Sequence, residues 1–171
     1  MPETKTQDAI ALLKQDHRTV EELFGKFEKA SGEGRKQALA EQICLELSVH
    51  AQIEEEIFYP ACEGKVEEDL LKESYVEHDA AKLLIAEIMT GSPDDEFYDS
   101  KVKVLGEEIE HHVGEEEMPK EGMFAQARET DVDLKALLEP MLARKQELKA
   151  QAENGGLPPA QLTTVQAEPA Q

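Results

Sequence analysis

Four of the five histidines in this chain fall one to each of four successive segments in which apolar residues recur every three or four positions. These are His17, His50, His78 and His112. Such a repeat predicts amphipathic α-helices, and each histidine lies on the apolar stripe of its segment. Unpaired imidazoles in a core are costly unless they hydrogen-bond or bind a metal. The chain is therefore restricted to folds in which four helices bring these stripes together.

The helical pattern covers most of the chain and is interrupted by clear turn signals. It runs through residues 8–30, 39–61, 67–90, 102–116 and, more weakly and across Pro140, 131–152. The breaks between the first four segments lie at 31–34, at Pro60 with Gly64, and at 91–94. This order predicts an all-α fold, namely an antiparallel up-down four-helix bundle with an additional C-terminal helix.

A chain of 171 residues is long enough for one domain with a genuine core. We expect this domain to cover residues 1–152. Residues 153–171 are rich in Pro, Gln, Ala and Gly and offer little to bury, so we predict that they form a disordered C-terminal tail.

Two histidines on the apolar stripes, His50 and His112, are followed four residues later by glutamates that can share their inward face, which gives the pairs His50 with Glu54 and His112 with Glu116. Residues four apart on an α-helix share a face, so each pair can point inward together. Because 38 of the 171 residues are acidic, either pair alone is weak evidence for a metal site. Their conjunction with one histidine on each helix indicates a metal site with ligands from four helices.

Helical phase makes two further distinctions. The neighbours His111 and His112 lie on different faces, and His111 shares its face mostly with polar residues, so we assign the inner position to His112. In the second helix, the stripe that contains His50 is expected to continue inward through Ile57 and Ala61.

Charge and hydropathy exclude several classes of partner. Acidic residues outnumber basic ones 38 to 18, which gives a formal charge of −20 and opposes binding to a phosphate backbone, so we expect no nucleic-acid partner. The N-terminus has no apolar signal region, and no segment approaches the roughly 18 apolar residues of a membrane span. We therefore expect a cytoplasmic protein without membrane contact.

The two cysteines, Cys44 and Cys62, are separated by 18 positions in one predicted helix. At a rise of ~1.5 Å per residue they would lie about 27 Å apart, far beyond the ~7 Å limit for a disulfide. We expect both to be ordinary reduced thiols.

The predicted ligand set favours particular metals. Imidazole nitrogen together with carboxylate oxygen suits Fe, Mn, Zn or Co better than Ca or Cu(I). If Glu54 and Glu116 both bridge, each of two metal ions receives two imidazoles and two carboxylate oxygens. An ion that prefers six ligands then keeps positions open for solvent or a small ligand such as O2, peroxide or NO.

The chain also resembles a known family over about residues 8–150. The segments that carry the likeness are Asp16-His17-Arg18, HAQIEEEIFYP (50–60), Glu77-His78-Asp79, HHVGEEEMP (111–119) and a closing segment within 133–148. Together they resemble the hemerythrin family in its HHE cation-binding branch. The resemblance implies a four-helix bundle with two non-haem Fe ions that bind O2 or related small molecules. It implies as metal ligands His17, His50, Glu54, His78, His112 and Glu116.

Two positions depart from the oxygen-carrying members of that family. Where carriers present a second histidine one turn before the third-helix ligand, this chain has Ser74. Its fourth-helix carboxylate, Glu116, follows His112 by four residues, where carriers use an aspartate at five. Both departures recur in the HHE branch, so they bear on O2 carriage rather than on the metal centre. Tyr75 is a candidate to fill the vacant position or donate a hydrogen bond, with a core tyrosine as the alternative, and Glu108 is a weaker candidate.

Three functions fit these residues. The first is a non-haem di-iron protein that binds or senses O2, peroxide or NO, with no catalytic residue assigned beyond the ligands. The second is a di-iron redox enzyme with peroxidase, catalase-like or oxidase activity. The third is a metal storage or handling protein that holds Zn or Mn. The residue pattern chooses neither the metal nor a protein partner.

Overall fold

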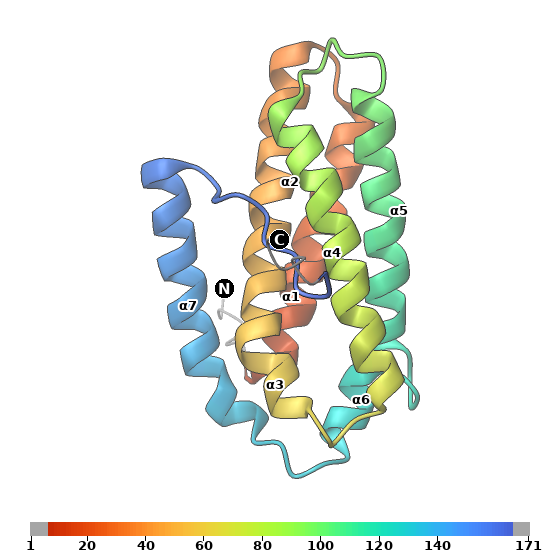
Figure 1. Ribbon diagram of the computed structural model, residues 1–171, viewed down its shortest axis with the longest axis vertical. Coiled ribbons are helices and arrows are strands. Elements are labelled where there is room, and N and C mark those ends of the chain that lie inside the picture. The colour runs from red at the N-terminus through yellow and green to blue at the C-terminus, as the bar shows by residue number, and fades with distance from the viewer. Residues whose placement is uncertain (1–6, 166–171) are drawn as a thin grey trace, which may run out of the picture.

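The computed structural model describes residues 7–165, and that part of the chain contains helices and no β-strand. Four long helices form a bundle: α1 (Ala9–Lys29), α2 (Glu33–Ile53), α4 (Glu68–Thr90) and α5 (Tyr98–Glu117). Successive helices alternate in direction, with α1 and α4 running upward and α2 and α5 downward in Figure 1. The predicted all-α antiparallel bundle is thereby confirmed.

The second helix ends near the expected position but is not a regular α-helix throughout. It passes from α2 through a π-helical turn, η1 (Glu54–Phe58), into α3 (Tyr59–Cys62). In this turn the amide of Tyr59 donates to the carbonyl of Glu54, five residues earlier. Pro60 follows at once. A proline inside a helix has no N–H and its ring clashes with the carbonyl four residues earlier, so a widened turn before it accommodates the ring.

The π turn changes which residues face the core. Because it holds one residue more than an α-turn, it rotates the following side chains relative to the predicted stripe. Ile57 and Ala61 are only half-buried, and their predicted inward placement is wrong. Phe58, Tyr59 and Cys62 are fully buried in their place.

Two apolar clusters form the core of the bundle, one toward each end. The lower cluster in Figure 1 includes Ile10, Leu13, Ile53 and Phe58, and the upper one includes Val20, Phe27, Ile43, Val102 and Leu105. Buried polar side chains lie between them. None of the helices within residues 7–165 combines the length and the apolar stretch that a membrane crossing requires.

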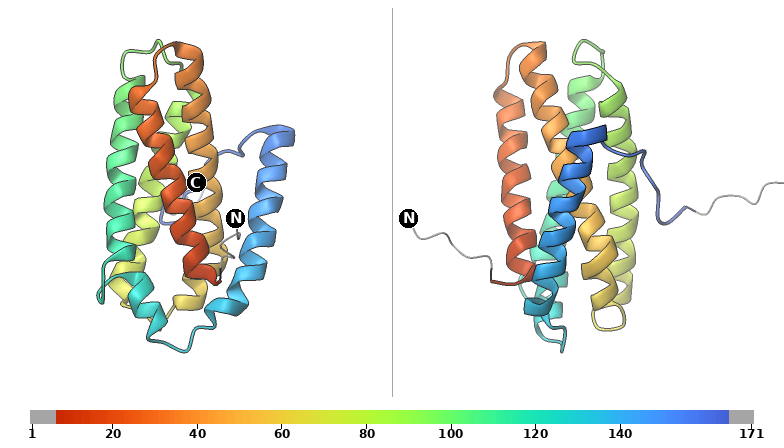
Figure 2. Two further views of the ribbon diagram at one scale, coloured as in Figure 1. Left: turned by 180° about the vertical axis from the view of Figure 1, so that it is seen from behind. Right: turned by 90° about the vertical axis from the view of Figure 1, so that its left-hand side faces the viewer.

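The chain after α5 flanks the bundle. A short helix that the sequence did not predict, α6 (Met123–Arg128), follows the turn at Gly122, where any Cβ would lie 2.5 Å from the carbonyl oxygen of Met118. The predicted C-terminal helix is α7 (Leu134–Gly155), which contains Pro140 and packs beside α1 and α2 (Figure 2). It buries Met141 and Leu148 against the lower cluster.

Residues 156–165, which we call the C-terminal strap, turn back from α7 onto the bundle (Figure 1). The turn begins at Gly156, whose φ of 76° lies in the left-handed region that favours glycine. Residues 153–155 of the predicted tail belong to α7, and the strap forms hydrogen bonds described below. The predicted boundary between the domain and the tail at residue 152 stays a prediction. The last part of the predicted tail, residues 166–171, lies outside the described residues.

The two cysteines yield a prediction about reactivity. Both are free and fully buried, and burial raises the pKa of each thiol to about 12. Because the thiolate is the reactive form, we expect neither to react with an aromatic disulfide reagent at pH 8 in the folded protein, and both to react in denaturant. A thiol titrated rapidly without denaturant would contradict the burial of Cys44 and Cys62.

Candidate metal centre

The structure brings all six predicted ligand residues together between the two apolar clusters. His17 comes from α1, His50 from α2, Glu54 from the start of η1, His78 from α4, and His112 with Glu116 from α5. Each is buried, with at most 6% of its surface exposed. The neighbouring His111 has a side chain that is 67% exposed, which confirms that His112 takes the inner position.

The ends of the helices set the level of these side chains. His78 lies 12 residues before the end of α4 at Thr90, and His112 lies 14 residues after the start of α5 at Tyr98. At about 1.5 Å per residue, these counts place both imidazoles at nearly the same height in two antiparallel helices. The helix boundaries therefore assemble the cluster without a distortion of α4 or α5.

Every imidazole in the cluster turns its Nε2 atom toward a glutamate oxygen. The Nε2-to-oxygen distances are 2.8 Å for His50 to Glu54, 2.9 Å for His112 to Glu116, 3.3 Å for His17 to Glu116 and 3.4 Å for His78 to Glu54. Glu54 and Glu116 thus each face two histidines, which is the arrangement that bridging carboxylates require.

Several of these buried atoms have no hydrogen-bond partner. They are Nε2 of His17 and His50, both carboxylate oxygens of Glu54, and Oε2 of Glu116. Ligand atoms within 4.8 Å of one another form two groups, one of Glu54, His78, His112 and Glu116 and one of His17, His50 and Glu116. Buried polar atoms without partners are rare in folded proteins and call for an ion or a water. Their nitrogen and oxygen chemistry fits a pair of transition-metal cations.

A second layer of carboxylates surrounds the histidines. The Nδ1-to-oxygen distances are 2.8 Å for His17 to Glu117, 3.0 Å for His50 to Asp16, 3.2 Å for His78 to Glu55 and 2.9 Å for His112 to Glu77. An ionised carboxylate only accepts hydrogen bonds, so each imidazole donates through Nδ1. In the neutral imidazole, Nε2 then carries no proton and is the atom free to bind a metal.

These outer carboxylates form a closed ring around the bundle. Each is adjacent in sequence to one predicted ligand and hydrogen-bonds with a histidine of the next helix. The pairs are Asp16 of α1 with His50 of α2, Glu55 of η1 with His78 of α4, Glu77 of α4 with His112 of α5, and Glu117 of α5 with His17 of α1. Successive helical residues point about 100° apart, so the neighbour of an inward ligand faces the adjacent helix. The sequence signal was the acidic residue directly beside four of the six ligands, namely His17, Glu54, His78 and Glu116, and its role was not predicted.

Basic side chains hold the outer carboxylates from their other side. The pairs are Lys145 with Asp16, Lys82 with Glu55, Arg18 with Glu117, and His111 with Glu77. Lys145 belongs to α7, so the C-terminal helix contacts the surroundings of the centre through Asp16. His17, His50 and His78 are therefore each fixed by a chain of charged hydrogen bonds that ends near the surface, and the chain at His112 ends with the exposed His111, 3.5 Å from Glu77.

Electrostatics favours charged carboxylates in the cluster. Burial alone would raise the pKa of Glu116, but His112 and His17 outweigh it and hold that pKa well below its usual range. Burial likewise opposes protonation of His50, yet Glu54 and Asp16 raise its pKa to about 10. The charged carboxylates thus favour a positive ion between them. Protons and metal cations therefore compete for the Nε2 atoms of the histidines.

Tyr59 joins the cluster although the sequence did not single it out. Its hydroxyl donates to Oε1 of Glu116 at 2.6 Å and lies 3.2 Å from Nε2 of His78. Ser74, the position at which oxygen carriers have a further histidine, donates its hydroxyl to the carbonyl of Leu70 at 3.1 Å and is near enough to affect the pKa of Tyr59. Tyr59 therefore lies at the centre, on the side of Ser74. The π turn puts it there, five residues after Glu54.

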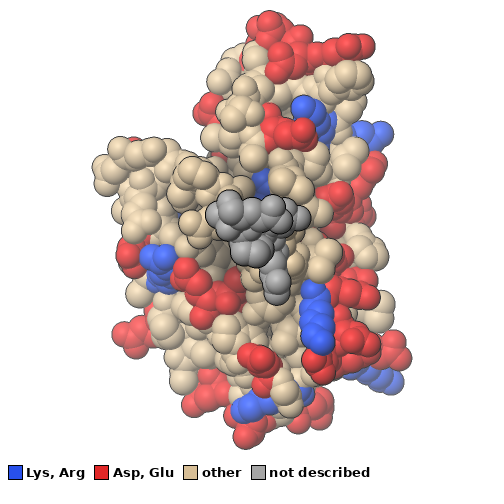
Figure 3. All heavy atoms as spheres, in the orientation of Figure 1, with Lys and Arg blue, Asp and Glu red and all other residues tan. Residues whose placement is uncertain are grey.

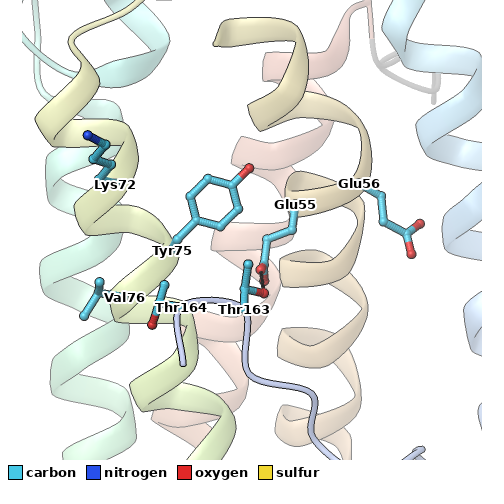
Figure 4. Close-up of a pocket in the computed structure, with 7 residues that line it drawn as sticks. All are labelled: Glu55, Glu56, Lys72, Tyr75, Val76, Thr163 and Thr164. Atoms are coloured by element: carbon cyan, nitrogen blue, oxygen red, sulfur yellow. Dashed lines mark hydrogen bonds between the residues drawn. The ribbon is translucent and has the colours of Figure 1, made fainter. Parts of the chain in front are cut away.

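The two weaker candidates lie outside the cluster. Tyr75 is half-buried and packs edge-on against Tyr59, with ring centroids 5.2 Å apart. It borders an outer hollow with Glu55, Lys72 and the strap (Figure 4). Glu108 lies beside the outer carboxylate Glu77, and burial together with that charge raises the pKa of Glu108. Tyr59, rather than Tyr75, is the tyrosine at the centre.

Comparisons with known proteins agree with this arrangement. A model of the hemerythrin HHE cation-binding domain matches residues 8–127. The chain is 29% identical over 106 residues to a DNA nickase of Nostoc sp., a match that covers 62% of this chain and 30% of that protein. The chain thus spans less than a third of that relative's length.

Among solved structures, the chain is similar to the crystal structure of a hemerythrin HHE cation-binding domain-containing protein from Mycobacterium kansasii. The TM-score is 0.71 at 22% sequence identity, with 87% of this chain and 94% of that chain covered, which supports the fold. The family model matches well over half of the chain and includes all six clustered residues. The chain therefore belongs to the hemerythrin HHE cation-binding domain family and is a metal-binding, hemerythrin-like protein.

Proposed function

We propose that this protein holds two non-haem iron ions and uses them to bind or sense O2, peroxide or NO. The proposed ligands are His17, His50, Glu54, His78, His112 and Glu116. The observation that carries the proposal is the set of buried ligand atoms that face one another without hydrogen-bond partners. An iron pair, when bound, supplies redox-active cations that accept small ligands at positions the protein leaves free.

In this proposal the protein orients the ligands and shields them from water on the side of His17. The outer carboxylates hold each imidazole with Nε2 directed inward. Phe124 stacks on the ring of His17, with centroids 5.8 Å apart, and Phe58 packs edge-on against Phe124 at 5.7 Å. These apolar walls limit water near the centre and strengthen its electrostatic interactions.

Tyr59 favours a redox enzyme as the second candidate. Burial beside Glu116 and Glu54 raises the pKa of Tyr59 well above its usual value, so the hydroxyl keeps its proton at neutral pH. This O–H, which lies 2.6 Å from Glu116, is positioned to donate a hydrogen bond to a reacting oxygen atom beside it. This arrangement supports peroxidase, catalase-like or oxidase chemistry as the alternative to simple binding.

The DNA nickase relative does not extend this proposal to nucleic acid. The match covers 30% of that protein. A formal charge of −20 and the carboxylates spread over the face in Figure 3 oppose contact with a phosphate backbone. We therefore propose a diatomic molecule or peroxide as the partner of the site.

Adjacent histidines give a matched pair of variants for the ligand assignment. We expect His112→Ala to lose at least one of two bound metal ions per chain, because it removes an inner ligand, and His111→Ala to retain both. Metal analysis after anaerobic Fe(II) reconstitution measures this, and absorption spectra with and without O2 or NO test the response. Wild-type protein without stoichiometric transition metal would refute the proposal. Colourless protein with Zn or Mn would favour metal storage or handling.

The outer carboxylates can be tested in the same way. Asp16→Asn removes the charged acceptor of His50, and we expect metal affinity to fall about 10–100-fold. Glu46→Gln is the control, because Glu46 also pairs with a lysine of α7, Lys149 at 2.8 Å, but touches none of the proposed ligands. Competition with a chromophoric chelator gives both affinities. Equal losses in the two variants would show that Asp16 has no special role.

Tyrosine variants distinguish turnover from binding. If the protein turns over peroxide, Tyr59→Phe should slow it by about 10²-fold, since it removes the positioned proton, while metal content stays unchanged. Tyr75→Phe should leave the rate unchanged. Steady-state peroxide consumption by the iron-loaded protein measures the effect, and no turnover by wild type would remove the redox-enzyme alternative.

A further inference from the structure

A cavity of about 920 Å³ lies between α2 and α4 and extends into the bundle. All four histidines of the proposed centre contribute to its lining. Most of the remaining wall is apolar and includes Val20, Leu47, Ile85, Ile109, Val113 and Leu157. Pockets for organic ligands have volumes of about 300–1,000 Å³, so this cavity is far larger than a diatomic molecule needs.

The C-terminal strap forms the outer wall of this cavity. Residues 157–163 line it, and the strap crosses between α2 and α4 in Figure 1. The amides of Thr163 and Thr164 donate to the two carboxylate oxygens of Asp79 on α4, at 2.9 and 2.7 Å. The hydroxyl of Thr163 donates to Glu55 (Figure 4), the carboxylate that holds His78. The strap is thus fixed to both sides of the opening.

The charges in the wall are already paired with one another or with nearby groups. Lys82 contacts Glu55 at 2.9 Å and Asp79 at 3.3 Å, and Glu56 pairs with Arg144 at 2.8 Å. Asp16 is held by His50 and Lys145. The lysine in the wall is therefore already paired, and most of the charged side chains on the face in Figure 3 are acidic, which opposes an anionic ligand. An uncharged, largely apolar molecule suits the protein walls of this cavity best.

We propose that the cavity under the C-terminal strap binds a neutral, largely apolar organic molecule directly beside the four-histidine centre. The volume, the apolar wall and the paired charges carry this inference. Its significance for the chemistry rests on the proposed metal function, because the bound molecule would lie next to the metal pair. Binding itself depends on the protein walls and is measured on metal-free protein.

The test uses 1-aminoanthracene, a neutral fluorescent probe, with the full chain freed of metal. We expect a saturable rise in fluorescence with a Kd on the order of tens of micromolar, given the size of the probe. Ala86→Phe, which places a ring into the cavity from α4, should weaken binding about tenfold. Leu83→Phe is the control, because Leu83 lies on the same helix and is 54% exposed away from the cavity.

The outcomes separate this inference from the metal proposal. Saturable binding that Ala86→Phe weakens and Leu83→Phe leaves within about twofold supports the cavity site, whatever the metal content of the protein. Absence of saturable binding by wild type, or equal binding by the two variants, overturns it. Circular dichroism of each variant shows that it retains the helical fold, and if the phenylalanine variant does not fold, Ala86→Leu provides a smaller side chain that still enters the cavity and should also weaken binding.

Discussion

The pairing of two buried glutamates with four buried histidines is the interaction on which the rest of the structure depends. Glu54 and Glu116 are almost fully enclosed between two apolar clusters. A carboxylate in such surroundings is strongly destabilising unless imidazolium groups or cations compensate its charge. The bundle brings four imidazoles to these two carboxylates, and the outer carboxylates orient the imidazoles in turn. The polar layer and the bundle therefore require each other.

The π turn shows how one local irregularity shapes the centre. In a regular α-helix, the residues after Glu54 would continue the stripe through Ile57 and Ala61. The widened turn before Pro60 instead directs Tyr59 toward Glu116 and His78. Its hydroxyl thereby lies 2.6 Å from Glu116 and 3.2 Å from His78. A proline whose steric demands concern the backbone thus decides which side chain lies next to the proposed metal ligands.

The family model matches residues 8–127, and the chain after residue 127 contributes further contacts to the surroundings of the centre. Through Lys145, α7 contacts Asp16, and through Thr163 the strap contacts Glu55, so both reach carboxylates that hold histidines. The strap also closes the cavity between α2 and α4. Contacts of this kind couple the C-terminal region to the orientation of His50 and His78 and to the space beside them. These contacts connect α7 and the largely exposed strap to the buried polar layer of the bundle.

The sequence by itself determined the helices, the inner histidines and the inward pairing of Glu54 with His50 and of Glu116 with His112, because helical periodicity is a local property that spacing reveals. It also distinguished His112 from His111 by phase alone. Only the tertiary structure decided the partners of those residues. The ring of outer carboxylates depends on which helices are adjacent, and the place of Tyr59 depends on a π turn that no apolar repeat records. The contacts of the strap join residues more than 80 positions apart, so they depend on the folded bundle rather than on any local pattern.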